Sequence, residues 1–181
     1  MCIRDRYYID VPEDLSAEKF AIIHSGIVEA ARIWNVSLDR EAIVIQGRTH
    51  ALTAPMIGTN DKGEVVILPP RDSVNGIYVV NDAAGFQSPH EGEGNAQART
   101  HLVYSGDYIN EADITINGTL NFHNDFSPSG SEARKLDIVR LMLHEFGHAL
   151  GLGHIDLQGD CLLYTSPSPR DATLSRMPSS A

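Results

Sequence analysis

The run HEFGHALGLGH, residues 144–154, restricts the fold of this chain more than any other part of the sequence. His144 and His148 are four residues apart, so a helix would place them one above the other on a single face. Gly151 follows at a position where helices commonly end in a left-handed conformation, which glycine adopts without a Cβ penalty. A chain reversal there would bring His154 close to His144 and His148. The run therefore predicts a helix, a sharp turn and a convergence of three imidazoles.

Three imidazoles with this spacing are typical of a catalytic zinc site, because three nitrogen ligands leave a fourth position open for water. Glu145 follows the first ligand, about 100° around the helix axis, and is therefore placed as a general base beside the metal. The five fixed positions would match by chance with an expectation of about 10⁻⁴. Two alternatives are an amphipathic helix with surface histidines and a structural or regulatory zinc clamp. The presence of Glu145 and the lack of an obvious fourth protein ligand argue against the clamp.

The two ends of the chain differ from the text between them. Residues 1–6 (MCIRDR) and 161–181, which contain Cys2 and Cys161, resemble adapter-like sequence attached to a natural fragment. The second segment is rich in Ser, Pro and Arg and has no helical or strand periodicity. We expect residues 1–6 to be a non-native leader, 7–160 a catalytic domain incomplete at its C-terminus, and 161–181 a non-native disordered tail. The alternative is that 161–181 is a genuine disordered tail.

Length and charge exclude several classes of function. A chain of 181 residues with 42% hydrophobic content suits one domain with a sizeable core. The formal net charge of −10 and the lack of a Lys/Arg cluster argue against nucleic acid and anionic membrane surfaces as partners. No apolar run reaches the length of a membrane span, and no signal peptide is visible at the start.

A long helix is predicted near the N-terminus, after a short strand at Tyr7–Val11. Ser16 is a plausible N-cap, and the helix should end near Asn35. Apolar residues recur at steps of three and four and predict one buried stripe. They are Phe20, Ile23, Ile27, Ala30 and Trp34.

Strands and turns dominate the middle of the chain. Apolar, β-branched runs predict strands at Ala42–Gln46, Glu64–Leu68 and Gly76–Val80, and the polar, glycine-rich residues 81–97 predict a loop. Arg99–Ser105 and Ala112–Asn117 alternate around Gly106-Asp107 and predict a hairpin. The expected fold is α/β (α+β), with a twisted sheet, mixed or mainly parallel, and two long helices.

The helix that carries the histidines should begin near Ser129 or Ser131, where Ser129 and Glu132 fit a capping box. Several apolar residues of this segment are expected to face the core. They are Ile138, Leu141, Met142, Phe146 and Leu150.

With these elements in place, the chain resembles the metzincin zinc endopeptidases and is most similar to bacterial matrixin-like proteins. The resemblance rests on LMLHEFGHALGLGH, on the first helix with ARIWNVSL, and on the strand EADITIN before a Phe/His/Asn loop. Ile155 departs from the residue that usually marks each metzincin branch, including the serine of matrixins. The resemblance implies the metzincin-like zincin fold, with the zinc helix under a cleft.

The resemblance also implies features that the motif alone does not predict. A Met-turn should follow the third ligand, but the tempting Met177 lies in the suspect tail and we reject it. Structural zinc and calcium ions are implied near the edge strand, where His101 occupies a similar place to one ligand, although we interpret it as an ordinary strand residue. His90, Glu91 and Glu93 lie in the preceding loop, and the family implies a secreted, extracellular location.

The resulting hypothesis is zinc-dependent hydrolysis of internal peptide bonds in an extended peptide or protein, held along the strand at 99–105. Glu145 would take the water proton. One alternative is a zinc-containing module that binds peptide or protein without turnover, as an inactive or truncated peptidase would. Another is a secreted hydrolase acting on a non-peptide amide or a cell-wall peptide.

Other motifs are given their simplest interpretation. Asn35-Val-Ser37 and Asn117-Gly-Thr119 match glycosylation triplets, but such triplets are common and no secretory signal accompanies them. His24, His50 and His123 are interpreted as surface or loop histidines.

Overall fold

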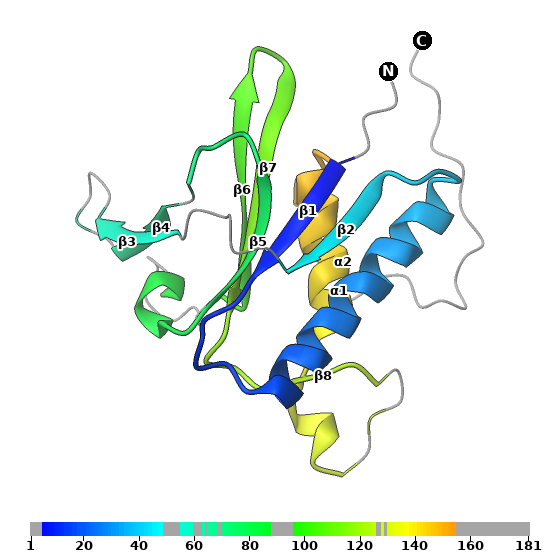
Figure 1. Ribbon diagram of the computed structural model, residues 1–181, viewed down its shortest axis with the longest axis vertical. Coiled ribbons are helices and arrows are strands. Elements are labelled where there is room, and N and C mark those ends of the chain that lie inside the picture. The colour runs from blue at the N-terminus through cyan, green and yellow to red at the C-terminus, as the bar shows by residue number, and fades with distance from the viewer. Residues whose placement is uncertain are drawn as a thin grey trace.

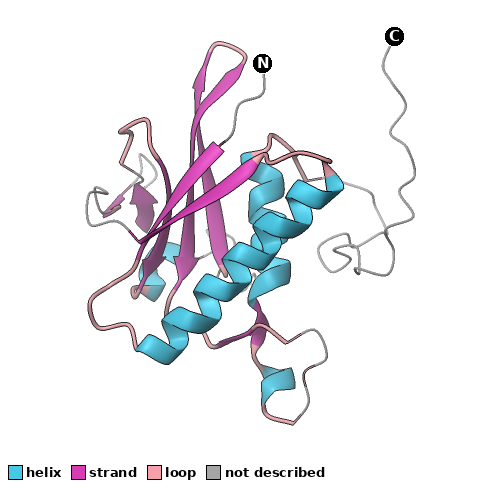
Figure 2. Cartoon of the chain, turned by 45° about the vertical axis from the view of Figure 1, so that its right-hand side comes forward, coloured by secondary structure: helices cyan, strands magenta, loops and turns pink. Residues whose placement is uncertain are grey.

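A five-stranded sheet with two helices on one face forms the centre of the structure, which is a computed structural model (Figures 1 and 2). It describes residues 5–48, 55–59, 63, 65–68, 70–87, 96–125, 128 and 130–154. The strands of this sheet are β1 (Asp5–Asp10), β2 (Ile43–Arg48), β5 (Asn75–Val80), β6 (Ala98–Ser105) and β7 (Tyr108–Asn117). The helices are α1 (Ala17–Ser37) and α2 (Ile138–Ala149).

The sheet is mixed, as the sequence predicts. Its strand order is β2-β1-β5-β7-β6, in which the first four strands are parallel and only β6 runs antiparallel to its neighbour. β6 and β7 form the predicted hairpin, with Gly106 in the turn at a φ of 61°. β6 is thus an edge strand of this sheet, and α2 packs against it.

The first helix follows its sequence signals closely. The Ser16 side chain accepts a hydrogen bond from the Lys19 main-chain nitrogen at 3.2 Å, which confirms the N-cap. The predicted stripe faces the core: Ile23, Ile27 and Ala30 are buried, while Phe20 and Trp34 at its two ends are partly buried against the same core. α1 therefore contributes one continuous apolar face to the space between the helices and the sheet.

A second, small sheet stands apart from the main one. β3 (Met56–Thr59) and β4 (Val65–Leu68) pair with each other in antiparallel register. The predicted strand at Glu64–Leu68 is confirmed as a strand, but its partner is β3, which the sequence did not reveal. Within the stretch predicted as a loop, residues 83–86 form a 3-10 helix, η1 (Ala83–Phe86).

The predicted start of the second helix is wrong. α2 begins at Ile138, and its N-cap is Asp137, whose Oδ1 accepts from the main-chain nitrogens of Val139 and Arg140 at 3.0 and 3.1 Å. Upstream lie η2 (Glu132–Arg134) and β9 (Leu136–Asp137), which pairs in parallel with β8 (Phe122–His123). This pairing holds the residues before α2 in extended conformation, so the segment after the predicted start at Ser131 forms only a short 3-10 turn. Ser129, the first residue of the predicted capping box, lies outside the described residues.

Tight contacts between the two helices and the sheet hold α2 in place. A Cβ added at Gly26 of α1 would lie 2.4 Å from Cγ2 of Ile138, so the helices approach closely at the start of α2. At the other end, the Phe146 ring packs edge-on against Tyr7 of β1, with centroids 5.4 Å apart. Ile138, Met142 and Phe146 are fully buried, and Leu141 and Leu150 are partly buried against the core, as predicted.

Candidate metal centre

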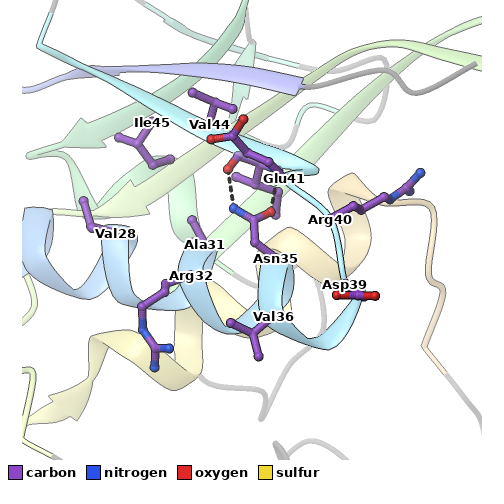
Figure 3. Close-up of a pocket in the computed structure, with 11 residues that line it drawn as sticks. Val28, Ala31, Arg32, Asn35, Val36, Asp39, Arg40, Glu41, Val44 and Ile45 are labelled. Atoms are coloured by element: carbon purple, nitrogen blue, oxygen red, sulfur yellow. Dashed lines mark hydrogen bonds between the residues drawn. The ribbon is translucent and has the colours of Figure 1, made fainter.

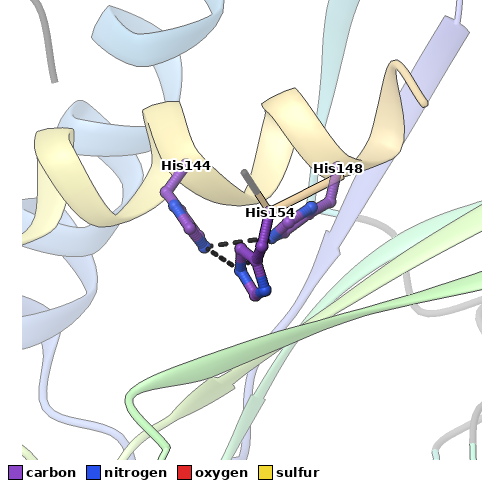
Figure 4. A group of neighbouring side chains, drawn as sticks. All are labelled: His144, His148 and His154. Carbon is purple, nitrogen blue, oxygen red and sulfur yellow. Dashed lines mark hydrogen bonds between the residues drawn. The ribbon is translucent and has the colours of Figure 1, made fainter. Parts of the chain in front are cut away.

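Two of the three histidines come from α2 itself. His144 and His148 lie one turn apart and turn their rings toward the same point, with the two Nε2 atoms 3.0 Å apart (Figure 4). The Nδ1 of His148 lies 2.7 Å from the main-chain oxygen of Leu152. A carbonyl oxygen can only accept, so Nδ1 carries the proton, and the Nε2 of His148 is left with a lone pair for a metal.

The third histidine arrives through the predicted reversal at Gly151. This residue has a φ of 90°, its nitrogen donates to the oxygen of His148 at 2.8 Å, and the nitrogen of Leu152 donates to the oxygen of Gly147 at 2.9 Å. These two bonds form a Schellman motif, which closes the last turn of the helix. The reversal places the Nε2 of His154 2.9 Å from that of His148 and 3.2 Å from that of His144.

The three nitrogens fit one tetrahedral metal ion. Zinc–nitrogen bonds of about 2.0–2.1 Å would separate the ligand atoms by about 3.3 Å, close to the three observed distances. Burial lowers the pKa of His144, and the neighbouring His148 and His154 lower it further, which favours the neutral, metal-binding imidazole. Within the described ranges, these three residues are the one group of three side chains whose ligand atoms lie close enough to share an ion.

Glu145 lies beside the histidines and is almost fully buried, with 4% of its surface exposed. Its Oε2 accepts a hydrogen bond of 2.6 Å from the hydroxyl of Thr100, on β6. Burial raises the pKa of Glu145, whereas the bond from Thr100 and the charge of His148 lower it. Thr100 was not predicted as a site residue, although one signal was present: it is a polar residue between Ala98 and Leu102 on the inward side of a strand.

The opposite face of the sheet carries two buried carboxylates that the sequence reading also missed. On β7, Asp113 accepts from the main-chain nitrogen of Gly76 at 2.8 Å, and Glu111 accepts from that of Ser73 at 2.6 Å. Burial raises the pKa of Asp113 to about 7; the bond from Gly76 opposes this, and Glu111 adds to it. The signal was the alternation of EADITIN, which places its polar residues on one face of β7.

Two further histidines lie in strands and are partly or fully buried. His123 is buried in β8, with 5% exposed, so its interpretation as a surface or loop residue is wrong. His101 is half-buried on β6, 3.3 Å from the Thr115 hydroxyl, and burial lowers its pKa to about 4. His50, together with the residues expected near a calcium ion at 90, 91 and 93, lies outside the described residues, so calcium stays a prediction.

A pocket of about 760 Å³ lies between α1 and β2 (Figure 3). β2 and β6 are opposite edges of the sheet, so this pocket is separated from the histidines beside β6. Asn35 lines it, donates to the oxygen of Ile43 at 2.7 Å and accepts from the nitrogens of Ala42 and Ile43. Asn117 is buried and its side chain is hydrogen-bonded to Ala96 and Thr119, so the asparagine of each glycosylation triplet is engaged by the fold.

No helix in the described part of the chain has the length and apolar character needed to cross a membrane.

Comparison with known protein families agrees with the geometry of the three histidines. No curated protein matches the chain. The profile of the matrixin family, by contrast, matches residues 75–176, more than half of the sequence. The matched range includes β5, the β6–β7 hairpin and all of α2 with its histidines, and it continues into the segment that we expect to be non-native, whose boundary at 160 stays a prediction. The chain therefore belongs to the matrixin family of zinc metallopeptidases.

Proposed function

We propose that residues 7–160 form the catalytic domain of a zinc endopeptidase, with His144, His148 and His154 as metal ligands and Glu145 as general base. The observation that carries this proposal is the convergence of three Nε2 atoms at 2.9–3.2 Å. Two sit on a helix and the third returns after a closed reversal, next to a buried carboxylate. A surface cluster of histidines would have no physical reason to direct three ring nitrogens at one point.

The chemistry divides between the metal and the chain. The neutral imidazoles of His144, His148 and His154 would hold a zinc ion, which would act as a Lewis acid on water and on the substrate carbonyl. Glu145 accepts the proton of the attacking water and passes it to the departing amine. His148 keeps its orientation through the bond from Nδ1 to Leu152, which fixes its tautomer.

The substrate that we propose is an extended peptide or protein segment. β6 runs beside α2 and is an edge strand among the described residues, so a peptide could add to its outer edge through main-chain hydrogen bonds. Such bonds carry little sequence preference, so specificity would come from side-chain pockets. We also propose that the protein works outside the cell, a location that rests on family membership alone.

Cleavage of a quenched peptide library by the zinc-loaded protein tests this proposal. Glu145→Ala should keep its zinc and lose turnover by about 10²–10⁴-fold, because only proton transfer is removed. Glu29→Gln, which alters an exposed salt bridge to Arg32 on α1, is the matched control and should cleave normally. Cleavage by Glu145→Ala at the wild-type rate, above a zinc-free control, would exclude the general-base role. Zinc-dependent peptide binding without cleavage by the wild type would instead support a binding module.

A further inference from the structure

A single threonine on the edge strand holds the carboxylate of Glu145. The Thr100 hydroxyl lies 2.6 Å from Oε2 of Glu145 and 3.1 Å from the main-chain oxygen of the same residue. The shorter contact has the length of a charge-assisted hydrogen bond from a hydroxyl to a carboxylate. We propose that Thr100 is a positioning residue, which fixes the Glu145 carboxylate in the orientation needed for proton transfer.

The side chains that surround Thr100 on the inward face of β6 are apolar. Ala98 is buried in the core and Leu102 packs against it, and both share the inward face of the strand with Thr100. The residue opposite Thr100 on β7 is Ile114, which is fully buried. A hydroxyl on such a face costs free energy unless it is hydrogen-bonded. Glu145 is the acceptor that satisfies it.

This bond decides which carboxylate oxygen is available. Oε2 already accepts the bond from Thr100, so Oε1 is the less engaged oxygen and the one we assign to the attacking water. A glutamate side chain has three rotatable bonds, and its rotamers are free to vary once that bond is removed. Because a misplacement of about 1 Å can cost about 10²-fold in rate, loss of the bond should lower kcat.

The same geometry predicts little effect on substrate binding. Side chains of a strand point out of the sheet, whereas its main-chain N–H and C=O groups lie in the plane in which an added strand would pair. Replacing the Thr100 side chain therefore leaves the proposed pairing edge intact. KM and zinc affinity should stay near the wild-type values while kcat falls.

The inference rests on the proposed function, and three variants of the zinc-loaded protein test it. Thr100→Val keeps the shape and loses the hydroxyl, and Thr100→Ser keeps the hydroxyl. Thr115→Val makes the same change on β7, where the hydroxyl contacts His101 and not Glu145. Thr100→Val should lower kcat by about 10–100-fold with KM unchanged. Thr100→Ser and Thr115→Val should stay within about threefold of wild type, since neither change removes the bond to Glu145.

A second measurement uses the zinc-free protein, so that it does not depend on activity. With ¹³C-carboxyl-labelled glutamate, the NMR signal of Glu145 is identified by its loss in Glu145→Gln. The chemical shift of this signal should change in Thr100→Val, whereas in Thr100→Ser and Thr115→Val it should equal the wild-type value. A stationary signal, wild-type kcat in Thr100→Val, or equal impairment in Thr100→Ser would overturn the inference. If the wild type cleaves nothing, the proposed function fails, and the carboxyl signal alone decides whether Thr100 positions Glu145.

Discussion

The indole Nε1 of Trp34 donates a hydrogen bond of 3.0 Å to the main-chain oxygen of Leu143. This bond joins the last third of α1 to the residue that precedes His144, so the long helix helps to hold the metal-binding turn of α2. The two residues are 109 positions apart in the sequence. The site therefore depends on a contact that only the packing of the two helices creates.

Trp34→Phe removes this bond and should lower the free energy of unfolding by about 1–2 kcal/mol, from the lost hydrogen bond and the smaller ring. Urea denaturation of the zinc-free protein measures it. Val36→Ala, two residues along the helix and largely exposed, is the control and should change stability by less than about 0.5 kcal/mol. Equal stability of Trp34→Phe and wild type would show that the bond contributes nothing.

Gly26→Ala should destabilise the protein, against the usual gain of about 1 kcal/mol for alanine in a helix. The new Cβ would meet Cγ2 of the buried Ile138 at 2.4 Å, and neither helix can move without disturbing the core. Gly147→Ala is the matched helical change, because its Cβ would make only ordinary contacts, with Trp34 at 3.5 Å and Leu152 at 3.8 Å. Thermal unfolding should show opposite signs for the two variants. A stabilised Gly26→Ala would mean that the helices do not approach this closely.

Gly151→Ala should weaken zinc binding by about tenfold, because a φ of 90° costs an L-residue about 1–2 kcal/mol and the reversal places His154. A steric clash does not contribute to the expected loss, since the nearest atom to the added Cβ is 3.5 Å away, on Ile109. Gly106→Ala imposes a similar backbone penalty in the β6–β7 turn, away from the ligands. Chelator competition should find its zinc affinity unchanged; a comparable loss in both variants would argue against a specific role of the reversal.

Metal removal should lower the thermal midpoint. A ligand that binds only the folded state adds about 2.7 kcal/mol at a hundredfold excess over its Kd, so chelation should remove a stabilisation of this order. His148→Ala should abolish the zinc-dependent rise, whereas His24→Ala, on α1 and outside the cluster, should keep it. The assignment of His148 as a ligand does not survive if its alanine variant responds to zinc as the wild type does.

Asp113→Asn should change how stability depends on pH. The folded protein raises the pKa of this buried carboxyl from 3.8 to about 7, so between these values the folded state holds a proton that the unfolded state has lost. Its contribution to stability is therefore present at low pH and is lost as pH rises toward 7. Because the two states differ by up to one bound proton, the free energy of unfolding should fall by up to about 1.4 kcal/mol per pH unit. The variant lacks this slope.

His101 also makes stability depend on pH, so the effect of Asp113 must be measured as a difference between two proteins. Its pKa is lowered to about 4, so from there to its ordinary value near 6.5 its contribution rises with pH and opposes that of Asp113. Urea unfolding at pH 5 and pH 7.5 therefore gives a clear result only as the difference between wild type and Asp113→Asn. Parallel profiles for the two proteins would show that the carboxyl is not protonated in the fold.

Several elements could be predicted because their signals are local. The Ser16 cap, the α1 stripe and the β6–β7 hairpin were confirmed, since each depends on residues within a few positions of one another. The predicted start of α2 was wrong because a capping pattern is local, whereas the pairing of β9 with β8 keeps the chain extended up to Asp137. The burial of His123 was missed because β8 has only two residues, too few to show a strand periodicity.

At the site, the three histidines and Glu145 could be predicted from residues 144–154 alone. Helical spacing and the left-handed preference of glycine act over eleven residues, so the convergence of His144, His148 and His154 follows from local geometry. Only the folded chain brings Thr100 to Glu145 and Trp34 to Leu143, 45 and 109 residues away. Such contacts depend on which faces of distant elements pack together, a choice made by burial of the whole core that no short pattern encodes.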